Sequence, residues 1–171
     1  MKKTSWKAFM DYEKEEKWLN EMSAKGLAMT DYVLCRYTFE DCAPGEYVYR
    51  IELLDNLPSS AESQKYLDFM AENGVENVAS WVRWVYFRRK ADRGPFDIYS
   101  DIDSRIKHYK RIMTLWLPAM FVELICAIIE LLANNLVLSA VLFVIFVVIF
   151  VHWNAVRKNV KKLRTEKQLR E

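Results

Sequence analysis

Two apolar runs, separated by only three residues, constrain this chain more than any other feature. They span residues 115–132 and 136–153, and each run of about 18 residues is just long enough for an α-helix to cross a hydrocarbon core of roughly 30 Å. The second run is almost entirely Val, Ile, Leu and Phe and lacks the polar stripe of a water-facing helix. A buried hairpin of a soluble protein is the alternative, but the sequence favours a two-helix transmembrane hairpin closed by the tight turn 133–135.

The charges beside the two runs predict how the hairpin is oriented. Four basic residues precede the first run, whereas the connecting turn carries no charge. By the positive-inside rule, both termini are expected in the cytoplasm. Five basic residues after the second run are predicted to contact anionic lipids of the inner leaflet. These lipid-contact candidates are Arg157, Lys158, Lys161, Lys162 and Arg164.

Two carboxylates interrupt the first apolar run. Glu123 and Glu130 are seven residues apart and therefore share a helix face with Ala119 and Ala127. One hypothesis is that this face binds a helix, a cation or a membrane protein, because charge is costly near the middle of a bilayer. The other is that Glu123 is protonated or hydrogen-bonded inside a packed hairpin, where the two alanines let the helices approach closely.

Charge also separates the regions of the chain. Residues 1–99 carry 14 Lys/Arg and 17 Asp/Glu, whereas residues 154–171 carry seven Lys/Arg and two Glu. An acidic domain argues against nucleic-acid binding. We therefore predict a cytoplasmic domain at 1–94, a linker helix at 95–113, the transmembrane hairpin at 114–153 and a basic cytoplasmic tail at 154–171.

The cytoplasmic domain shows a weak internal repeat at an offset of 48 residues. Helices are predicted at 13–25 and 61–73, and a strand-like run follows each of them, at 29–40 and 77–89. A further strand at 46–54 is expected to form a hairpin with 29–40 across the Pro44-Gly45 turn, and residues 5–10 supply a first strand. The resulting fold class is α+β, with a ferredoxin-like βαββαβ order, or αββαβ without the first strand.

The last predicted strand is apolar or aromatic on both faces. Trp81, Trp84 and Tyr86 are its most prominent side chains, and a strand of this kind is usually covered on both sides. The cover could be the linker helix, a second copy or another protein. We take these three residues as partner-binding candidates, with aromatic core packing as the alternative.

The sequence contains no recognisable catalytic arrangement. It has two histidines and four glycines, with no Ser/His/Asp set, no His/Cys metal cluster and no glycine-rich phosphate loop. The acidic residues at 11–16 are expected to complement a helix N-terminus and face solvent. We expect no enzyme activity, no cofactor and no metal.

Several segments, in this order and spacing, resemble the family called domain of unknown function 2812. They are EEKWLNEM at 15–22 with Gly26, YTF at 37–39, YVYRI at 47–51, YFR at 86–88 and the pattern around Asp101, Ser104-Arg105-Ile106 and Tyr109. The resemblance covers about residues 8–112. It implies a protein of the bacterial cell membrane, found mainly in Firmicutes and often encoded beside PadR-type regulators, without established catalytic residues.

Together these features favour a non-enzymatic, membrane-anchored interaction or regulatory module. It would hold a cytoplasmic protein partner, or a second copy of itself, at the inner leaflet, and the resemblance connects it with a PadR-type regulator or an envelope stress response. An accessory subunit of a membrane transporter that uses the acidic face of the first span is the main alternative. An RNA-binding domain and an enzyme are less favoured.

Overall fold

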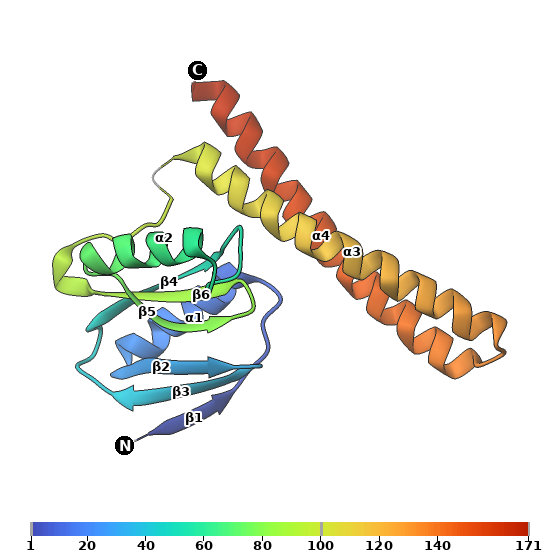
Figure 1. Cartoon of the computed structure of the whole chain (residues 1–171), viewed down its shortest axis with the longest axis horizontal. Helices are drawn as coiled ribbons and strands as arrows, with labels where there is room; N and C mark the ends of the chain where they lie inside the picture. The colour runs from blue at the N-terminus through green and yellow to red at the C-terminus, as the bar shows by residue number, and fades with distance from the viewer. Residues whose placement is uncertain (1, 100, 171) are drawn as a thin grey trace. The chain divides into compact units, whose positions relative to one another are not determined.

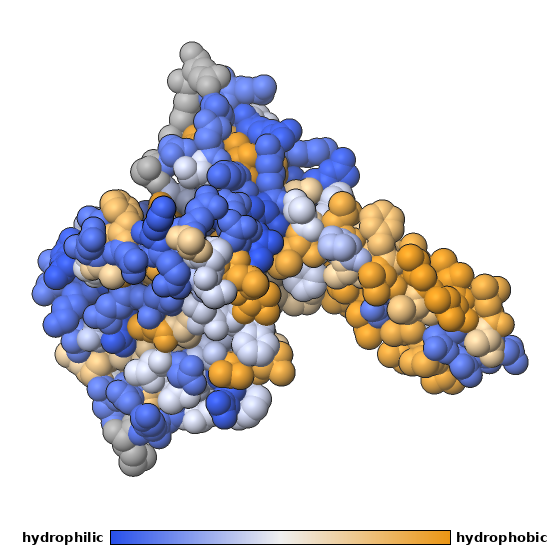
Figure 2. Space-filling view, in the orientation of Figure 1, coloured by the Kyte–Doolittle hydropathy of each residue, from blue (hydrophilic) through white to orange (hydrophobic). Residues whose placement is uncertain are grey.

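The computed structural model describes residues 2–99 and 101–170. The chain divides into two compact units, Met1–Ile98 and Tyr99–Glu171, which we call the sheet unit and the helical unit. The sheet unit contains strands and two helices, and the helical unit contains two long helices (Figure 1). Apolar residues cover much of the helical unit (Figure 2). The α+β class with two apolar C-terminal helices is therefore confirmed.

The sheet unit is built from two halves with the same order of elements. The first half comprises β1 (Lys3–Trp6), α1 (Tyr12–Ala24), β2 (Leu27–Val33) and β3 (Arg36–Asp41). The second half comprises β4 (Tyr47–Leu53), α2 (Ala61–Glu72), β5 (Glu76–Trp81) and β6 (Trp84–Lys90), followed by the short 3-10 helix Ala91–Arg93. Each half forms an antiparallel three-stranded sheet with its third strand in the middle, in the orders β1-β3-β2 and β4-β6-β5.

The two halves repeat each other in detail at the offset seen in the sequence. The register shift of β2 between Met29 and Asp31 recurs in β5 between Asn77 and Ala79. Both helices are followed by a glycine with positive φ, Gly26 at 79° and Gly74 at 71°, a conformation that glycine adopts without steric cost. The repeat therefore extends to bulges and helix ends.

The strand connections differ from the predicted βαββαβ and αββαβ orders. The runs 29–40 and 77–89, each expected to be one strand, are hairpins with two-residue turns at 34–35 and 82–83. The predicted hairpin across Pro44-Gly45 is wrong, because β4 pairs with β6 instead of β3. The physical reason is that β1 and β2 already occupy both edges of β3, so no free edge remains for β4.

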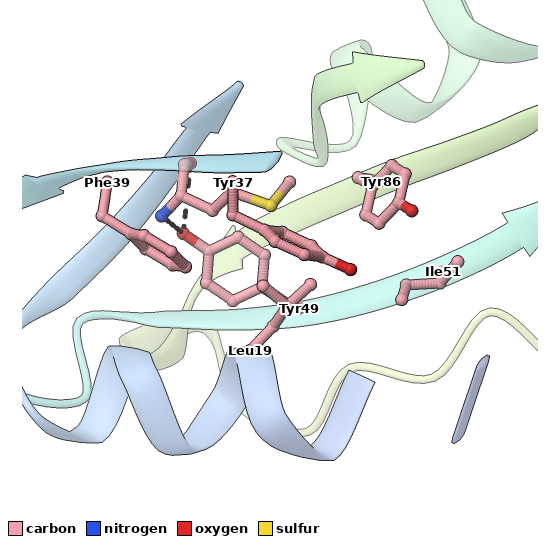
Figure 3. Close-up of a cluster of buried hydrophobic side chains, with 7 residues drawn as sticks. Leu19, Tyr37, Phe39, Tyr49, Ile51 and Tyr86 are labelled. Carbon is pink, nitrogen blue, oxygen red and sulfur yellow. Dashed lines mark hydrogen bonds between the residues drawn. The ribbon is translucent and has the colours of Figure 1, made fainter. Parts of the chain in front are cut away.

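Two hydrophobic clusters cover the two faces of β6. On one face, Tyr86 joins a cluster that draws residues from α1 and from both sheets (Figure 3). On the other, Val85 and Phe87 pack with Met70 of α2. The sequence predicted apolar or aromatic side chains on both faces of this strand. In the structure, both faces of β6 pack against other parts of the sheet unit.

Helix α1 also closes the open edge of the second sheet. β4 is an edge strand, and three α1 side chains bind its backbone at alternate residues. The Asn20 amide donates to Tyr49 O and accepts from Tyr49 N–H at 3.2 and 2.8 Å, and the Ser23 hydroxyl makes the same pair of bonds with Tyr47. The Ile51 N–H donates to Glu16. An edge that could pair with another chain is thereby satisfied internally.

The helical unit is an antiparallel pair. Helix α3 spans Ile102–Leu132 and continues through Pro118, and α4 spans Leu136–Arg170. The residues predicted as linker and first span therefore lie largely in one helix, and the predicted basic tail continues α4. Asp101 caps α3 by accepting from Ser104 N–H at 2.7 Å.

Candidate functional site

Specific polar contacts close the helical hairpin at both of its ends. The Ser139 hydroxyl donates to Ala127 O at 2.9 Å near the turn, and Lys167 bonds Asp103 at 2.7 Å at the opposite end. Ala127 is buried, as expected for a small residue at a close helix crossing. Ala119, for which the same role was predicted, is exposed instead, so α4 approaches α3 closely at Ala127 and not at Ala119.

The two carboxylates that interrupt the first apolar run have different surroundings. Glu130 accepts from the Asn135 side-chain amide at 2.8 Å and is thereby tied to the turn. Glu123 is half-buried, and its Oε1 is inaccessible yet has no hydrogen-bond partner among the described residues. The shared acidic face predicted from the sequence therefore consists of one carboxylate satisfied at the turn and one unsatisfied carboxyl oxygen farther along α3.

By length and composition, both helices could cross a membrane. Large apolar side chains are exposed along them, including Phe121, Val122, Ile129, Val137 and Val144. Such continuous apolar exposure marks a surface suited to lipid or protein contact and is unusual for a surface that faces water. It is consistent with membrane association.

The five predicted lipid-contact residues all lie on the exposed side of the last turns of α4. Arg157, Lys158, Lys161, Lys162 and Arg164 are exposed, and the Arg157 guanidinium lies over the Trp153 ring at 5.6 Å. Apolar residues before and between them, Val156, Val160 and Leu163, are buried. The basic segment is therefore an amphipathic continuation of the helix.

The three aromatic partner-binding candidates are not equivalent. Trp81 ends β5 and Trp84 begins β6, and both are half-buried. The Trp84 ring lies 6.1 Å from that of Tyr12, and the Trp81 ring 6.5 Å from that of Tyr32. Tyr86 is only 3% exposed and belongs to the core. A partner could reach the two tryptophans but not Tyr86 in the folded unit.

A buried carboxylate lies where the two sheets share their core. Glu15 of α1 is 8% exposed and accepts hydrogen bonds from Tyr37 of β3 at 2.6 Å and Tyr86 of β6 at 2.7 Å. The expectation that the acidic residues at 11–16 all face solvent is therefore wrong for Glu15. Its spacing of four from Leu19 places it on the buried helix face, which is the sequence signal that identifies it.

Burial dominates the acid–base properties of this cluster. It raises the pKa of Glu15, although the two tyrosine hydroxyls lower that pKa. Burial and the neighbouring Glu15 also raise the pKa of Tyr86. At the next residue of α1, burial raises the pKa of Glu16 to about 7, opposed mainly by the Arg50 guanidinium at 3.4 Å. Glu15, Tyr37 and Tyr86 are each under 10% exposed, so the arrangement joins the two sheets and offers no open site for a substrate.

Comparison of the sequence with protein families finds one family that matches this chain. The sequence profile of the family described as "Protein of unknown function (DUF2812)" matches residues 11–121. The chain belongs to the DUF2812 family. The match begins at the N-terminus of α1 and ends inside the apolar part of α3. The DUF2812 pattern thus includes both halves of the sheet unit, except for β1, and the start of the first apolar helix.

No curated protein and no solved structure matches the chain. In this DUF2812 member, the part of the chain that the structure describes contains no group of three or more His, Cys, Asp or Glu residues placed to hold a metal ion. Of the predicted site residues, the structure leaves Trp81, Trp84 and the five basic residues of α4 accessible and Glu123 without a hydrogen bond to its Oε1 among the described residues.

Proposed function

We propose that this DUF2812 member is a non-enzymatic, membrane-anchored interaction module of the bacterial cell membrane. In this proposal, α3 and α4 cross the bilayer as a hairpin and hold the sheet unit at its cytoplasmic surface. The observation that carries it is the antiparallel helix pair with exposed apolar side chains between its polar ends. Lipid is the surrounding that such a surface fits best.

The charge distribution supports an orientation with both termini inside. The four basic residues before the first span are Arg105, Lys107, Lys110 and Arg111, and the five exposed basic residues of α4 follow the second span. The turn between the spans carries no charge. Basic residues remain on the cytoplasmic side, where they also attract anionic lipids.

The topology can be tested by cysteine labelling in intact cells. The three native cysteines are replaced, and a single cysteine is placed at Asn134 in the turn or, as the matched control, at Gln168 near the end of α4. We expect a membrane-impermeant maleimide to label Asn134→Cys in intact cells and Gln168→Cys only after lysis. Equal labelling of both, or release of the chain by alkaline carbonate, would contradict the proposal.

The partner is proposed to be a cytoplasmic protein, such as a PadR-type regulator or a component of an envelope stress response, or a second copy of the chain. The half-buried Trp81 and Trp84 support this part of the proposal because such side chains can gain burial in a complex. A photocrosslinking amino acid at Trp84 should capture the partner in cells. If the same site captures only lipid, it does not serve protein recognition.

A second candidate is an accessory subunit of a membrane transporter, which the unsatisfied Glu123 Oε1 favours. A carboxyl oxygen of this kind can gain a hydrogen bond from a polar group on another membrane helix. We expect Glu123→Leu to retain membrane insertion but lose co-purification with a membrane partner, whereas Glu130→Leu keeps both. Retention of the partner by both variants would remove this candidate.

A further inference from the structure

Exposed apolar side chains gather at one end of the sheet unit. Among its described residues, seven large hydrophobic side chains are exposed, and six of them lie on or beside turns at the same end. We call these six the tip surface: Trp6, Met10, Val33, Leu34, Leu57 and Val82. Trp6, Leu34 and Val82 are 72%, 62% and 60% exposed. The seventh, Phe69, lies on α2.

Contacts within the unit bring the two halves together at this end. Trp6 is paired with Arg36, directly after the turn that carries Leu34. The adjacent Lys7 N–H donates to Cys35 O at 2.9 Å. In the second half, Arg83 binds Leu54 through both its backbone carbonyl and its side chain, which ties the Val82 turn to the segment that leads to Leu57.

The ring contact between Tyr32 and Trp81 brings the two hairpin tips side by side. Both tips point the same way in Figure 1, and apolar and pale side chains appear at this end in Figure 2. The tip surface is therefore one feature assembled from both halves.

The backbone at the two tips is unfavourable for the residues it carries. Leu34 and Cys35 have φ of 41° and 66°, and Val82 has φ of 56°. Two-residue hairpin turns with positive φ strongly prefer glycine, asparagine or aspartate, and a β-branched residue there is a true outlier. Folding alone would favour small polar residues at these positions. Large apolar side chains at both tips point to a contact outside the unit.

The chain itself indicates which surface lies within reach. The sheet unit ends at Ile98, and within α3 only the 13 residues from Ile102 to Thr114 precede the first apolar run. At 1.5 Å per helical residue this is about 20 Å, comparable to the size of a unit of about 100 residues. If the hairpin spans a membrane, the unit is always beside lipid.

The form of the tip surface also fits lipid better than a protein partner. Its apolar side chains stand on four separate turns, with the exposed basic residues Lys7 and Arg36 among them. A fluid interface adapts to separate protruding side chains, whereas a protein partner needs a continuous complementary surface. Tryptophan with neighbouring basic residues is typical of the boundary between headgroups and acyl chains.

We propose that the tip surface inserts into the headgroup region of the bilayer crossed by α3 and α4, with Lys7 and Arg36 beside lipid phosphates. This proposal rests on the membrane anchor proposed above. The contact would fix which side of the sheet unit faces the cytoplasm, and Trp81 and Trp84, which flank the Val82 turn, would lie beside the lipid headgroups.

Cys35 provides a probe inside the tip surface. The full chain with Cys42→Ser and Cys126→Ser keeps only this thiol, which is labelled with an environment-sensitive dye. The chain is then reconstituted into vesicles of phosphatidylcholine and phosphatidylglycerol. We expect dye emission at shorter wavelength than that of the free dye in buffer, and quenching by lipids that carry a shallow nitroxide. Trp6→Ser/Val82→Ser should reverse both effects, whereas Phe69→Ser, an equally apolar but distant change, should not.

The outcomes separate this proposal from the anchor. Chain that floats with vesicles but shows water-like emission would overturn the tip contact and leave the anchor standing. A shift that disappears when the chain is diluted into more lipid would show that a second copy covers the surface, which also overturns the lipid contact. Failure to float with vesicles would overturn the anchor and the tip contact with it.

Discussion

The two halves of the sheet unit share a local fold but use their helices differently. Both have a strand, a helix and a hairpin, the same sheet order, the same bulge and the same turn positions. Yet α1 lies in the core shared by both sheets, whereas α2 packs on the outer face of the second sheet. The same secondary structure thus yields one helix whose buried face serves both sheets and one helix that packs on a single sheet.

The difference is visible at positions related by the 48-residue offset. Leu19 of α1 is fully buried, whereas its counterpart Leu67 in α2 is half-buried. Asn20 binds the backbone of β4, whereas its counterpart Asp68 is exposed. A repeat therefore predicts which elements form, but not which copy of each element is buried.

The largest effect is expected from a substitution in the core that α1 shares with both sheets. Leu19→Ala should lower the free energy of unfolding by about 2–5 kcal/mol because it opens a cavity in a closed core. Leu67→Ala, the matched change in α2, should cost no more than about 1–2 kcal/mol because the site is already open to solvent. Chemical unfolding of the full chain in detergent, followed by near-ultraviolet circular dichroism, measures both. Equal losses would show that the two helices are equally important to the core.

A smaller effect is expected at the edge of the second sheet. Asn20→Ala removes the partner of both the Tyr49 N–H and the Tyr49 carbonyl, which should cost about 2–4 kcal/mol. Asp68→Ala, at the equivalent position of α2, should change stability by less than about 0.5 kcal/mol. The same unfolding measurement applies. A small effect of Asn20→Ala would mean that water replaces the amide and that the helix does not protect the edge.

The smallest expected effect is a pH dependence carried by α1. The folded-state pKa of Glu16 is about 7, above the ordinary value of 4.5. Between these values the folded chain binds the Glu16 proton more tightly than the unfolded chain does. Protonation of Glu16 therefore adds to the free energy of unfolding. This added stability is complete below pH 4.5 and is lost as the pH rises to about 7. Going from pH 5 to pH 8 should therefore cost about 1–3 kcal/mol.

A substitution that copies the equivalent residue of the second half tests how much Glu16 contributes to the pH dependence of stability. Glu16→Gln introduces the residue found at the equivalent position of α2, Gln64. This variant should lose less stability than the unsubstituted chain between pH 5 and pH 8. Glu21→Gln, an exposed change on the same helix, should leave the loss as it is in the unsubstituted chain. Thermal unfolding midpoints at the two pH values measure the difference. An unchanged slope in Glu16→Gln would assign the pH dependence to other groups, such as Glu15.

The sequence predicted the elements with strong local signals. Helices α1 and α2 begin and end within one residue of the predicted bounds, because an apolar stripe and a following glycine mark each of them. The two hairpins were missed because their turns, Leu34-Cys35 and Val82-Arg83, contain none of the residues that usually mark a turn. The buried Glu15 was missed because a single carboxylate in an acidic helix start resembles a solvent-facing charge.

By itself, the sequence determined the α+β class, the repeat and the apolar helix pair, because periodicity and hydrophobicity are properties of residues close together in the chain. Only the tertiary structure decided that β4 pairs with β6, that α1 serves both sheets, and that Glu130 is satisfied at the turn while Glu123 Oε1 is not. Each of these depends on which edges, faces and hydrogen-bond partners are already occupied by distant parts of the chain. That occupancy exists only after folding brings those parts together.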